Sequence, residues 1–351
     1  MIASLLRLLP LALPMALASC HGAPAAREVR RVAIDNRSGE ALWLCTVARD
    51  GFGERTALPA ARTFALSLPP GRYALQLGER GPRVALPLPP AELGYEPPAL
   101  TALTVWPWPA PEADWCWIPP GPALCGDDLG VGQEDERPVT TPTLPGYWLA
   151  RCETSNAQYA AFLAATGRAG VDPGWLDLGG PQCRIRWDDA AQTFTTDAPD
   201  LPVVKVSWAG AVAYCRWLTA TTGVTHRLPS EREWEKAARG AGSRAFAYGD
   251  TCTANAANQA SGRLRPCGSY APSEFGLCDL TGNVFEWTGD PYGDGGWRAL
   301  RGGSFVLDGV FIRNAMRMRL RPEVLADDTG FRVLRENADT RFGPSHDEDS
   351  R

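Results

Sequence analysis

Hydrophobic and polar residues alternate along much of the stretch from Val29 to Leu100, which is the pattern of half-buried β-strands. Residues 31–35 alternate in this way, a cluster of turn-forming residues follows, and a second apolar run begins at Ala41. A Pro-Pro-Gly turn at 69–71 leads into a further alternating run. Short strands separated by turns predict a small β-sandwich over residues 29–100, and the segment holds no catalytic constellation, so we interpret it as a spacer.

The pattern changes after residue 100. Prolines alternate with other residues from Pro107 to Pro111, and proline cannot continue a helix or a central strand, so residues 101–113 are predicted to be a linker. Most of the remaining chain reads as short strands and long loops, and residues 337–351 form a polar tail. Apolar spacing and capping signals, such as the Ser230/Glu233 capping box, predict three helices: Asn156–Thr166, Ser207–Thr222 and Ser230–Arg239.

The N-terminus has the pattern of an export signal. One charged residue, Arg7, precedes an apolar run from Leu8 to Ala18 that is too short to span a bilayer as a stable helix. The run ends in Leu-Ala-Ser followed by Cys20, which resembles the lipobox of bacterial lipoproteins. We therefore expect a signal peptide over residues 1–19, a lipid on Cys20 and a short tether over 20–28. The alternative is an ordinary signal peptide with an incidental Cys20.

The composition of the chain limits the classes of partner that are expected. The chain has 351 residues and a net charge of −5, so no overall basic field favours nucleic acid. Its three histidines are His21, His226 and His346, and two of them lie near the ends, which argues against a three-histidine metal centre. The expected protein is exported and membrane-anchored, in the periplasm or at the cell surface. Its expected partners are the membrane, through the lipid, and an unknown extracytoplasmic protein or small molecule.

Ten cysteines fit an exported protein. Cys116 with Cys125, and Cys252 with Cys267, are close in sequence and lie in loop-like stretches, so these are the two disulfides that we predict first. The chain contains no Cys-x-x-Cys motif, which argues against a zinc ribbon, a thioredoxin-type site and c-type haem.

Several motifs of the second half occur in one order along the chain. They are Trp117-Ile118-Pro119-Pro120-Gly121, Glu153-Thr154-Ser155-Asn156, Arg227-Leu228-Pro229-Ser230-Glu231-Arg232-Glu233-Trp234, Gly276-Leu277-Cys278-Asp279-Leu280-Thr281-Gly282-Asn283-Val284-Phe285-Glu286-Trp287, Arg301-Gly302-Gly303-Ser304-Phe305 and Gly330-Phe331-Arg332. Over about residues 114–336 this order resembles the formylglycine-generating enzyme (sulfatase-modifying factor) family. The resemblance implies an α+β fold, a variant of the C-type lectin fold with few helices and long loops.

The resemblance also implies a structural calcium ion. Family members bind it through residues that match the carboxylates of Asp279 and Glu286 and the backbone carbonyls of Gly282 and Val284. Such oxygen ligands suit Ca²⁺, whereas the alternative is that the two acids pair with arginines. A second family calcium site would use Asn258 and the carbonyl of a neighbour such as Gln259. Since the following loop lacks the acidic ligand, we expect this second site to be degenerate.

The copper site of the family's oxidases is not preserved. Those enzymes bind copper through two cysteines, three and eight positions after the serine of the Gly-Gly-Ser motif. Counted from Ser304, these positions hold Leu307 and Ile312, which cannot ligate a metal. Because thiolates are the ligands that select Cu(I), copper is not expected and no catalytic residue is assigned.

Arginines are the remaining candidates for a binding pocket. Arg301, Arg313 and Arg317 are expected near the Gly-Gly-Ser turn with Ser304, where guanidinium groups could bind carboxylate, sulfate or phosphate. The alternative is that they pair with core acids such as Glu231, Glu233 and Glu235. The sequence thus favours a binding or structural module over an enzyme. An oxidoreductase of the same family with an unknown substrate is the second hypothesis.

Overall fold

The computed structural model describes residues 29–48, 51–89 and 102–339. Its N-terminal part is the predicted β-sandwich, with one sheet in the order β4-β1-β7 and the other in the order β3-β2-β5-β6. Buried side chains of both sheets, such as Ile34 and Leu86, form a single core between them. The strands are β1 (Arg30–Asn36), β2 (Leu42–Ala48), β3 (Gly51–Ala57), β4 (Thr63–Leu68), β5 (Gly71–Leu77), β6 (Arg83–Leu88) and β7 (Ala102–Val105).

Strand β7 lies in the segment that the prolines predicted to be a linker. It pairs parallel to β1, and Leu103 and Val105 are buried in the sandwich core. The sandwich therefore extends beyond the predicted boundary at residue 100. The prediction was wrong here because the prolines begin only at Pro107, so nothing prevents residues 102–105 from joining a sheet.

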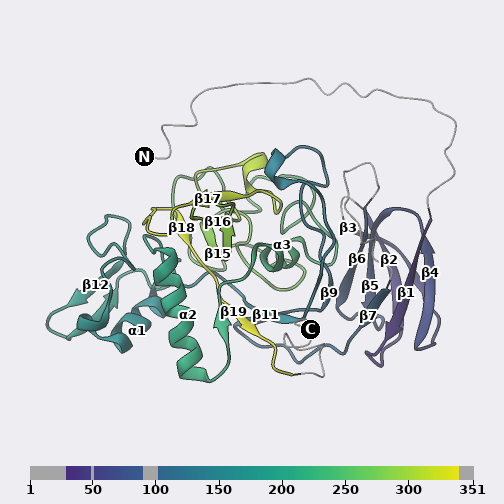
Figure 1. Ribbon diagram of the computed structural model, residues 1–351, viewed down its shortest axis with the longest axis horizontal. Helices are drawn as coiled ribbons and strands as arrows, with labels where there is room; N and C mark the ends of the chain where they lie inside the picture. Colours follow the sequence, from purple (N-terminus) through teal and green to yellow (C-terminus); the bar gives the residue numbers. More distant parts are fainter. Residues whose placement is uncertain (1–28, 49–50, 90–101, 340–351) are drawn as a thin grey trace.

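The sandwich is packed directly against the larger C-terminal domain (Figure 1). The Arg72 guanidinium contacts Asp128 at 2.6 Å and Asp250 at 2.9 Å, and both aspartates belong to the larger domain. Phe52 and Ala74 of the sandwich share an apolar cluster with Phe275. The first domain is thus docked through ion pairs and apolar contacts as well as through the connecting chain.

The three predicted helices are confirmed: α1 (Asn156–Thr166), α2 (Trp208–Thr222) and α3 (Glu231–Arg239). Each has a serine N-cap whose hydroxyl accepts a backbone N–H of the first turn, and these residues are Ser155, Ser207 and Ser230. The capping boxes of α1 and α3 are both formed. Three single-turn 3₁₀ helices complete this part of the structure: η3 (Glu134–Glu136), η4 (Arg168–Gly170) and η5 (Gly309–Ile312).

Two small sheets frame the larger domain, in the orders β14-β19-β11-β8 and β17-β16-β15-β18. Tyr159, Tyr214, Trp287 and Phe331 belong to its main apolar core, where the rings of Tyr159 and Tyr214 stack at 5.8 Å. The strands are β8 (Trp115–Ile118), β9 (Gly121–Pro122), β10 (Thr143–Leu144), β11 (Tyr147–Ala150), β12 (Ile185–Asp188), β13 (Thr193–Thr196), β14 (His226–Arg227), β15 (Phe285–Tyr292), β16 (Trp297–Arg301), β17 (Met318–Leu320), β18 (Thr329–Gly330) and β19 (Leu334–Glu336).

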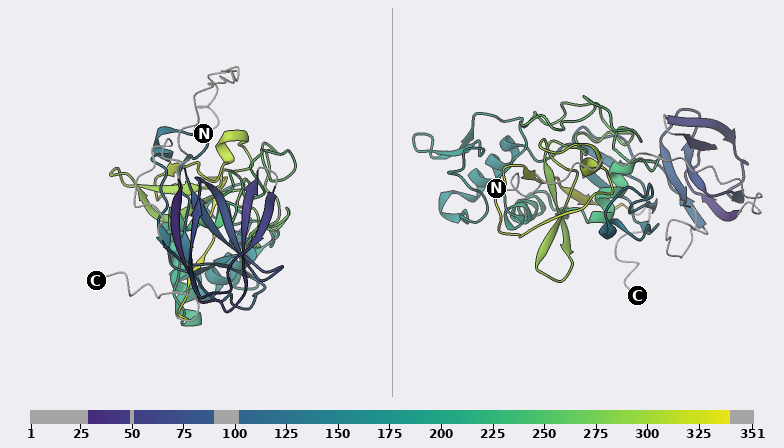
Figure 2. Two further views of the ribbon diagram at one scale, coloured as in Figure 1. Left: turned by 90° about the vertical axis from the view of Figure 1, so that its right-hand side faces the viewer. Right: turned by 90° about the horizontal axis from the view of Figure 1, so that it is seen from above.

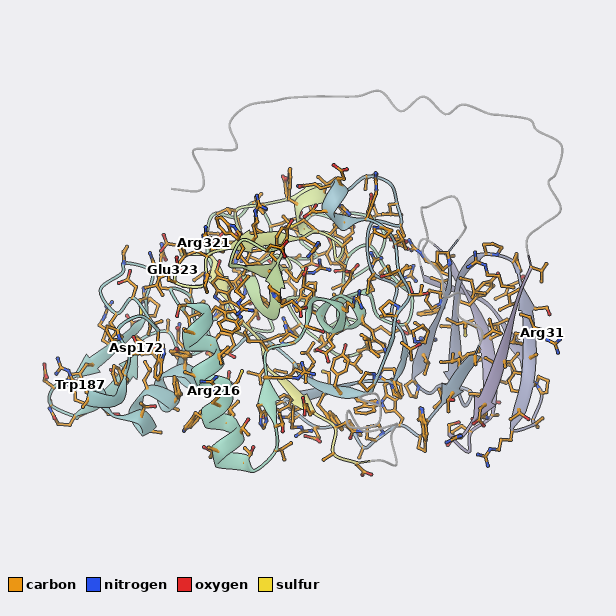
Figure 3. All side chains as sticks on the ribbon, in the orientation of Figure 1. Arg31, Asp172, Trp187, Arg216, Arg321 and Glu323 are labelled. Atoms are coloured by element: carbon orange, nitrogen blue, oxygen red, sulfur yellow. The ribbon has the colours of Figure 1, made fainter. Side chains whose placement is uncertain are left out.

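The sandwich and the β12–β13 hairpin lie at opposite ends of the molecule (Figure 2). Figure 3 places Trp187 near the end of this hairpin and Arg31 on the sandwich, with Arg321 beside the β15–β17 strands between them. No helix among the residues described is long and apolar enough to cross a membrane.

Candidate functional site

Two neighbouring cavities open between η3 and the β15–β17 strands. The first has a volume of about 530 Å³ and the second about 590 Å³. Asp135 and Arg317 line both cavities, so the two form one continuous surface. Its residues come from η3, from the start of α3 and from the strands that follow residue 285. Cys125 and Gly126 also line the first cavity, so the surface is assembled from segments that are far apart in the sequence.

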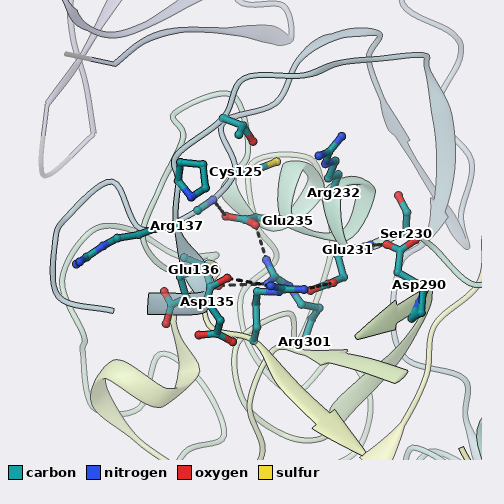
Figure 4. A pocket seen from close by; sticks show the side chains of 16 residues that line it. Cys125, Asp135, Glu136, Arg137, Ser230, Glu231, Arg232, Glu235, Asp290 and Arg301 are labelled. Atoms are coloured by element: carbon teal, nitrogen blue, oxygen red, sulfur yellow. Dashed lines mark hydrogen bonds and ion pairs between the residues drawn. The ribbon is translucent and has the colours of Figure 1, made fainter. Parts of the chain in front are cut away.

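Arg301 lies at the centre of the first cavity (Figure 4). Its Nη2 contacts Glu235 Oε2 at 2.5 Å and the carbonyl of Asn314 at 2.8 Å, and its Nη1 lies 3.6 Å from Glu231 Oε2. Glu235 also accepts the Nε–H of Arg239 at 2.8 Å. The Arg301 guanidinium is thus largely committed to protein acceptors, and it is only 1% exposed.

The other two candidate arginines are paired as well. Arg317 binds both carboxylate oxygens of Glu231, at 2.7 and 2.6 Å. Arg313 binds both oxygens of Glu136, at 2.9 Å each. The alternative interpretation, in which the arginines neutralise acids of this chain, therefore holds for all three, although Arg313 pairs with an acid that the sequence did not suggest. Arg301 and Arg317 line the cavity, whereas Arg313 is not among its lining residues.

Helix α3 explains why so many charges are buried beside this cavity. Glu233 pairs with Arg227 at 2.7 Å, and Lys236 donates to the carbonyls of Pro119 and Gly121. Burial lowers the pKa of Lys236 to about 7. Since a buried charge is stable only when it is paired or hydrogen-bonded, the charged sequence of α3 encodes a polar core and not an exposed helix.

Ser304 does not belong to the cavity surface. Its side chain is fully buried, and its hydroxyl donates to Asp328 Oδ2 at 2.9 Å. The prediction that it lines a pocket was wrong because Gly302 and Gly303 both have positive φ, and the turn that they make directs the serine into the interior.

The second cavity is lined by apolar and aromatic side chains on one side. Leu307, Phe311, Met316 and Met318 line it together with Tyr292. Arg319 also lines it, and its guanidinium lies 5.4 Å from the ring centre of Tyr292 and 5.5 Å from that of Trp297. Arg319 forms no ion pair with any acid of the described chain, in contrast to the three arginines above. Val306 and Val310, which precede Leu307 and Phe311 in the sequence, are 53% and 45% exposed.

Of the two positions that would hold the copper cysteines, one lies at this cavity and the other in the core. Leu307 lines it, while Ile312 is fully buried. Leu307 packs against the apolar cluster that contains Ile312, Ala245 and Phe246. A copper site would need two sulfur ligands at these positions, and two aliphatic side chains of one apolar cluster occupy them here.

Cys125 is the one cysteine among the described residues that line either cavity. Burial, together with the charge of Glu235, raises the pKa of its thiol to about 12. Because the thiolate is the nucleophile and the metal ligand, this thiol is inert at neutral pH.

Neither predicted disulfide is present. Cys116, Cys125, Cys252 and Cys267 are all free in the structure. Cys116 packs in the apolar cluster around β8 and β11, whereas the Cys125 backbone bridges to Thr140 at the cavity. Cys252 is exposed and donates to Gln259 Oε1 at 3.4 Å, while the Cys267 thiol donates to the Glu153 carbonyl at 3.6 Å. Closeness in the sequence did not bring these sulfurs together because their side chains face different parts of the fold.

The expected calcium segment is buried, and its two acids have different environments. Glu286 accepts Arg332 Nε at 2.6 Å and Nη2 at 2.7 Å, and Trp234 Nε1 at 2.7 Å, so both of its oxygens are occupied. Asp279 accepts the N–H of Gly268, but its Oδ1 is buried without a hydrogen-bond partner. Of these two acids, Asp279 alone offers a free oxygen to a cation.

Glu153 lies beside Asp279 and was not predicted as part of this segment. Its Oε1 accepts the Asn283 side-chain amide at 2.8 Å, and its Oε2 is buried without a partner. Burial, followed by repulsion from Asp279, raises the pKa of Glu153 well above its usual value. Burial likewise raises the pKa of Asp279. Glu153, Asp279 and Glu286 thus gather around one arginine, Arg332, and the cluster carries more acid than base.

At the expected degenerate second calcium site, hydrogen bonds within the protein occupy the polar groups of the Asn258 side chain. The Asn258 amide donates to the Arg263 carbonyl at 2.9 Å and to Asn283 Oδ1 at 2.8 Å. Its own oxygen accepts the Ser261 hydroxyl at 2.5 Å. The Asn258 side chain thus has no group left unpaired, and the Gln259 side chain, which donates to the Thr253 carbonyl, faces away toward Cys252.

Comparison with known proteins identifies the family to which the chain belongs. Residues 106–337 match the model of the sulfatase-modifying factor enzyme 1-like domain. The chain belongs to this family. The formylglycine-generating enzyme of Streptomyces coelicolor is 30% identical over 284 residues, which cover 62% of this chain and 88% of that enzyme. The structure of PvdO from Pseudomonas aeruginosa is 26% identical, with a TM-score of 0.51 over 64% of this chain and 94% of that one.

One of the relatives carries the word inactive in its name. The mouse protein named inactive C-alpha-formylglycine-generating enzyme 2 is 37% identical to this chain over 180 residues. That match covers 45% of this chain and 53% of the mouse protein. The sulfatase-modifying factor fold predicted from the motifs is thus confirmed, while the family alone leaves the activity open.

Sequence reasoning missed most of the cavity surface. Asp135 and Tyr292 line it, yet no local motif marks them as neighbours. The run Glu134-Asp135-Glu136 was a usable signal, since three adjacent acids in an arginine-rich chain indicate ion pairing.

Proposed function

We propose that this chain is a binding module of the sulfatase-modifying factor family and not a copper-dependent formylglycine-generating oxidase. The observation that carries the proposal is the pair of aliphatic residues at the copper positions. Leu307 faces the second cavity and Ile312 fills the core behind it, so neither copper position supplies a thiolate. Cys125 does not replace them, because its buried thiol stays protonated.

The second cavity is the surface that we propose for ligand binding. Leu307, Phe311 and Met318 give it an apolar lining, and the neighbouring Val306 and Val310 are about half exposed. Apolar cavities with a few polar groups are the usual form of ligand sites. Arg319 adds a positive charge that contacts aromatic rings and forms no ion pair with an acid of the described residues. The expected ligand is an extracytoplasmic protein or a small molecule.

Copper binding tests the proposal at the two positions themselves. We expect the wild-type protein to bind no stoichiometric Cu(I), because neither Leu307 nor Ile312 supplies the thiolate that would hold it. The double variant Leu307→Cys/Ile312→Cys is expected to gain Cu(I) affinity, since the two side chains belong to one contact cluster. Competition with a chromophoric Cu(I) chelator measures both. Stoichiometric, tight copper in the wild-type protein would contradict the proposal.

We propose that the protein is exported and held on a membrane by a lipid on Cys20. This residue lies outside the described part of the chain, and the support is the Leu-Ala-Ser-Cys sequence after an apolar run. Cys20→Ser is expected to move the protein from the membrane fraction into the soluble fraction, because the acyl chains are lost. Fractionation followed by immunoblotting measures this. Retention of the variant on membranes would show that another anchor operates.

We propose that a calcium ion bound to the larger domain would be held by Asp279 and Glu153, with Glu286 reserved for Arg332. The unpartnered oxygens of Asp279 and Glu153 and the excess of acids in this cluster support a cation here. Such an ion would neutralise the buried carboxylates and stabilise the surrounding loops.

Chelation tests the calcium proposal. A metal that binds the native state stabilises it by mass action, so a calcium chelator is expected to lower the melting temperature by roughly 5–10 °C. The Asp279→Ala variant should lose this dependence, whereas Asp197→Ala, at an exposed site, should keep it. Differential scanning fluorimetry measures the shift. A wild-type melting temperature that ignores the chelator would mean that Glu153 and Asp279 share a proton instead.

A further inference from the structure

Two cysteines that belong to neither cavity lie side by side in the larger domain. Cys152 lies two residues after the end of β11, and Cys278 precedes the buried segment 279–286. The N–H of Cys278 donates to the carbonyl of Arg151 at 2.8 Å, so the two chain segments run next to each other at this point. The full stretch between the two cysteines contains α1, α2 and α3.

The side chains of these two cysteines face each other. The Cys152 thiol and the Cys278 sulfur are hydrogen-bond partners, and the Arg151 side chain donates to the Cys278 sulfur. Arg332 fixes the backbone on both sides, since its Nη2 donates to the Cys278 carbonyl at 2.9 Å and its Nη1 to the Arg151 carbonyl at 3.2 Å. Cys278 is buried and Cys152 is half-buried, so Cys152 is the more accessible residue of the two.

We propose that Cys152 and Cys278 form a disulfide bond when the protein meets a disulfide oxidant. One thiol attacks the oxidant, for example oxidised glutathione, and forms a mixed disulfide while one glutathione thiol leaves. The second thiol attacks the protein sulfur of this mixed disulfide and releases the other glutathione thiol. Both cysteine thiols are thereby oxidised, one molecule of oxidised glutathione is reduced to two thiols, and the two thiol protons go to solvent or to the leaving groups.

Other pairings with these two cysteines are less favourable. The Cys267 thiol is directed to the carbonyl of Glu153, and the Cys116 sulfur packs in the apolar cluster of β8 beside Gly276. Cys183 and Cys215 are buried in the main core of the domain. A bridge between Cys152 and Cys278 would close a long loop around all three helices, and long loops are those in which a disulfide restricts the unfolded chain most.

Peptide mapping of the full chain tests the proposal. The protein is incubated with oxidised glutathione, its remaining thiols are alkylated, and it is digested with trypsin and then with a protease that cleaves after glutamate. Cleavage after Glu274 separates Cys267 from Cys278, so the linked fragment identifies its cysteines. We expect the Cys152–Glu153 fragment joined to Phe275–Glu286, at the combined mass less two hydrogen atoms. A linkage of Cys152 to Cys267 or of Cys116 to Cys278, or the recovery of both proposed partners as free thiols, would overturn the proposal.

Melting curves give a second readout that does not depend on the fragments. The oxidised wild-type protein is expected to melt roughly 5–10 °C above the reduced protein. Cys152→Ser, at a half-buried site, should abolish this difference, while Cys183→Ser serves as a control that should keep it. A redox-dependent shift that persists in Cys152→Ser would assign the effect to another pair. The mapping of the wild-type protein decides the linkage even where a serine variant folds poorly.

Discussion

Arg332→Met is expected to lower the free energy of unfolding of the larger domain by about 3–5 kcal/mol, because it leaves a buried carboxylate without its counter-charge. Arg332 and Glu286 are both fully buried, and two hydrogen bonds of 2.6 and 2.7 Å join them. Glu153 and Asp279 lie near the same guanidinium, so its loss exposes three acids to one another. Burial of an unpaired charge is among the few mechanisms that give a loss of this size.

Urea unfolding of purified variants measures this effect. The control is Arg184→Met, since Arg184 binds both oxygens of Asp197 with similar distances, 2.8 and 2.7 Å, but at an exposed site. We expect little change there, because exposed ion pairs contribute little. If Arg332→Met does not fold, Arg332→Lys keeps the charge and should show a smaller loss. Equal stabilities of Arg332→Met and Arg184→Met would contradict the role given to the buried pair.

The helices and the family could be predicted from the sequence because their signals are local. Ser230 and Glu233 are three residues apart, and the capping box that they predict is formed in the structure. The order of the Gly-Gly-Ser and Gly-Phe-Arg motifs identified the fold in the same way, since each motif makes its own turn or strand. The alternation of residues 31–35 likewise predicted a strand of the sandwich.

The site could be predicted only in part, because its contacts join residues far apart in the chain. Nothing near Glu286 in the sequence indicates that its partner is Arg332, and nothing near Arg313 indicates Glu136. For the same reason, closeness in the sequence predicted disulfides between cysteines that the fold keeps apart. It gave no indication that Cys152 and Cys278 face each other. The residues at the two copper positions of the family were more informative. Leu307 and Ile312 cannot ligate copper at those positions, whatever side chains surround them.

The absence of formylglycine-generating activity is the second large effect that we expect. An oxidase of this type needs a metal-bound thiolate to activate oxygen and a thiol to capture the substrate cysteine. The second cavity offers Leu307, with Ile312 buried behind it. The one thiol among the described residues that line either cavity, Cys125 in the first, has a pKa of about 12. Because aliphatic groups supply neither the electron-transfer path nor the nucleophile, no turnover is expected with or without added copper.

Mass spectrometry of a sulfatase-motif peptide tests this central claim most directly. The peptide is incubated with the purified full chain and Cu(I) in air, in parallel with an active formylglycine-generating enzyme as the positive control. We predict that its cysteine stays unconverted in the presence of this protein, while the control converts it to formylglycine with the corresponding loss of mass. Conversion by the wild-type chain that is abolished by Cys125→Ser, or by any other cysteine substitution, would show that a relocated thiol acts in catalysis and would contradict the account.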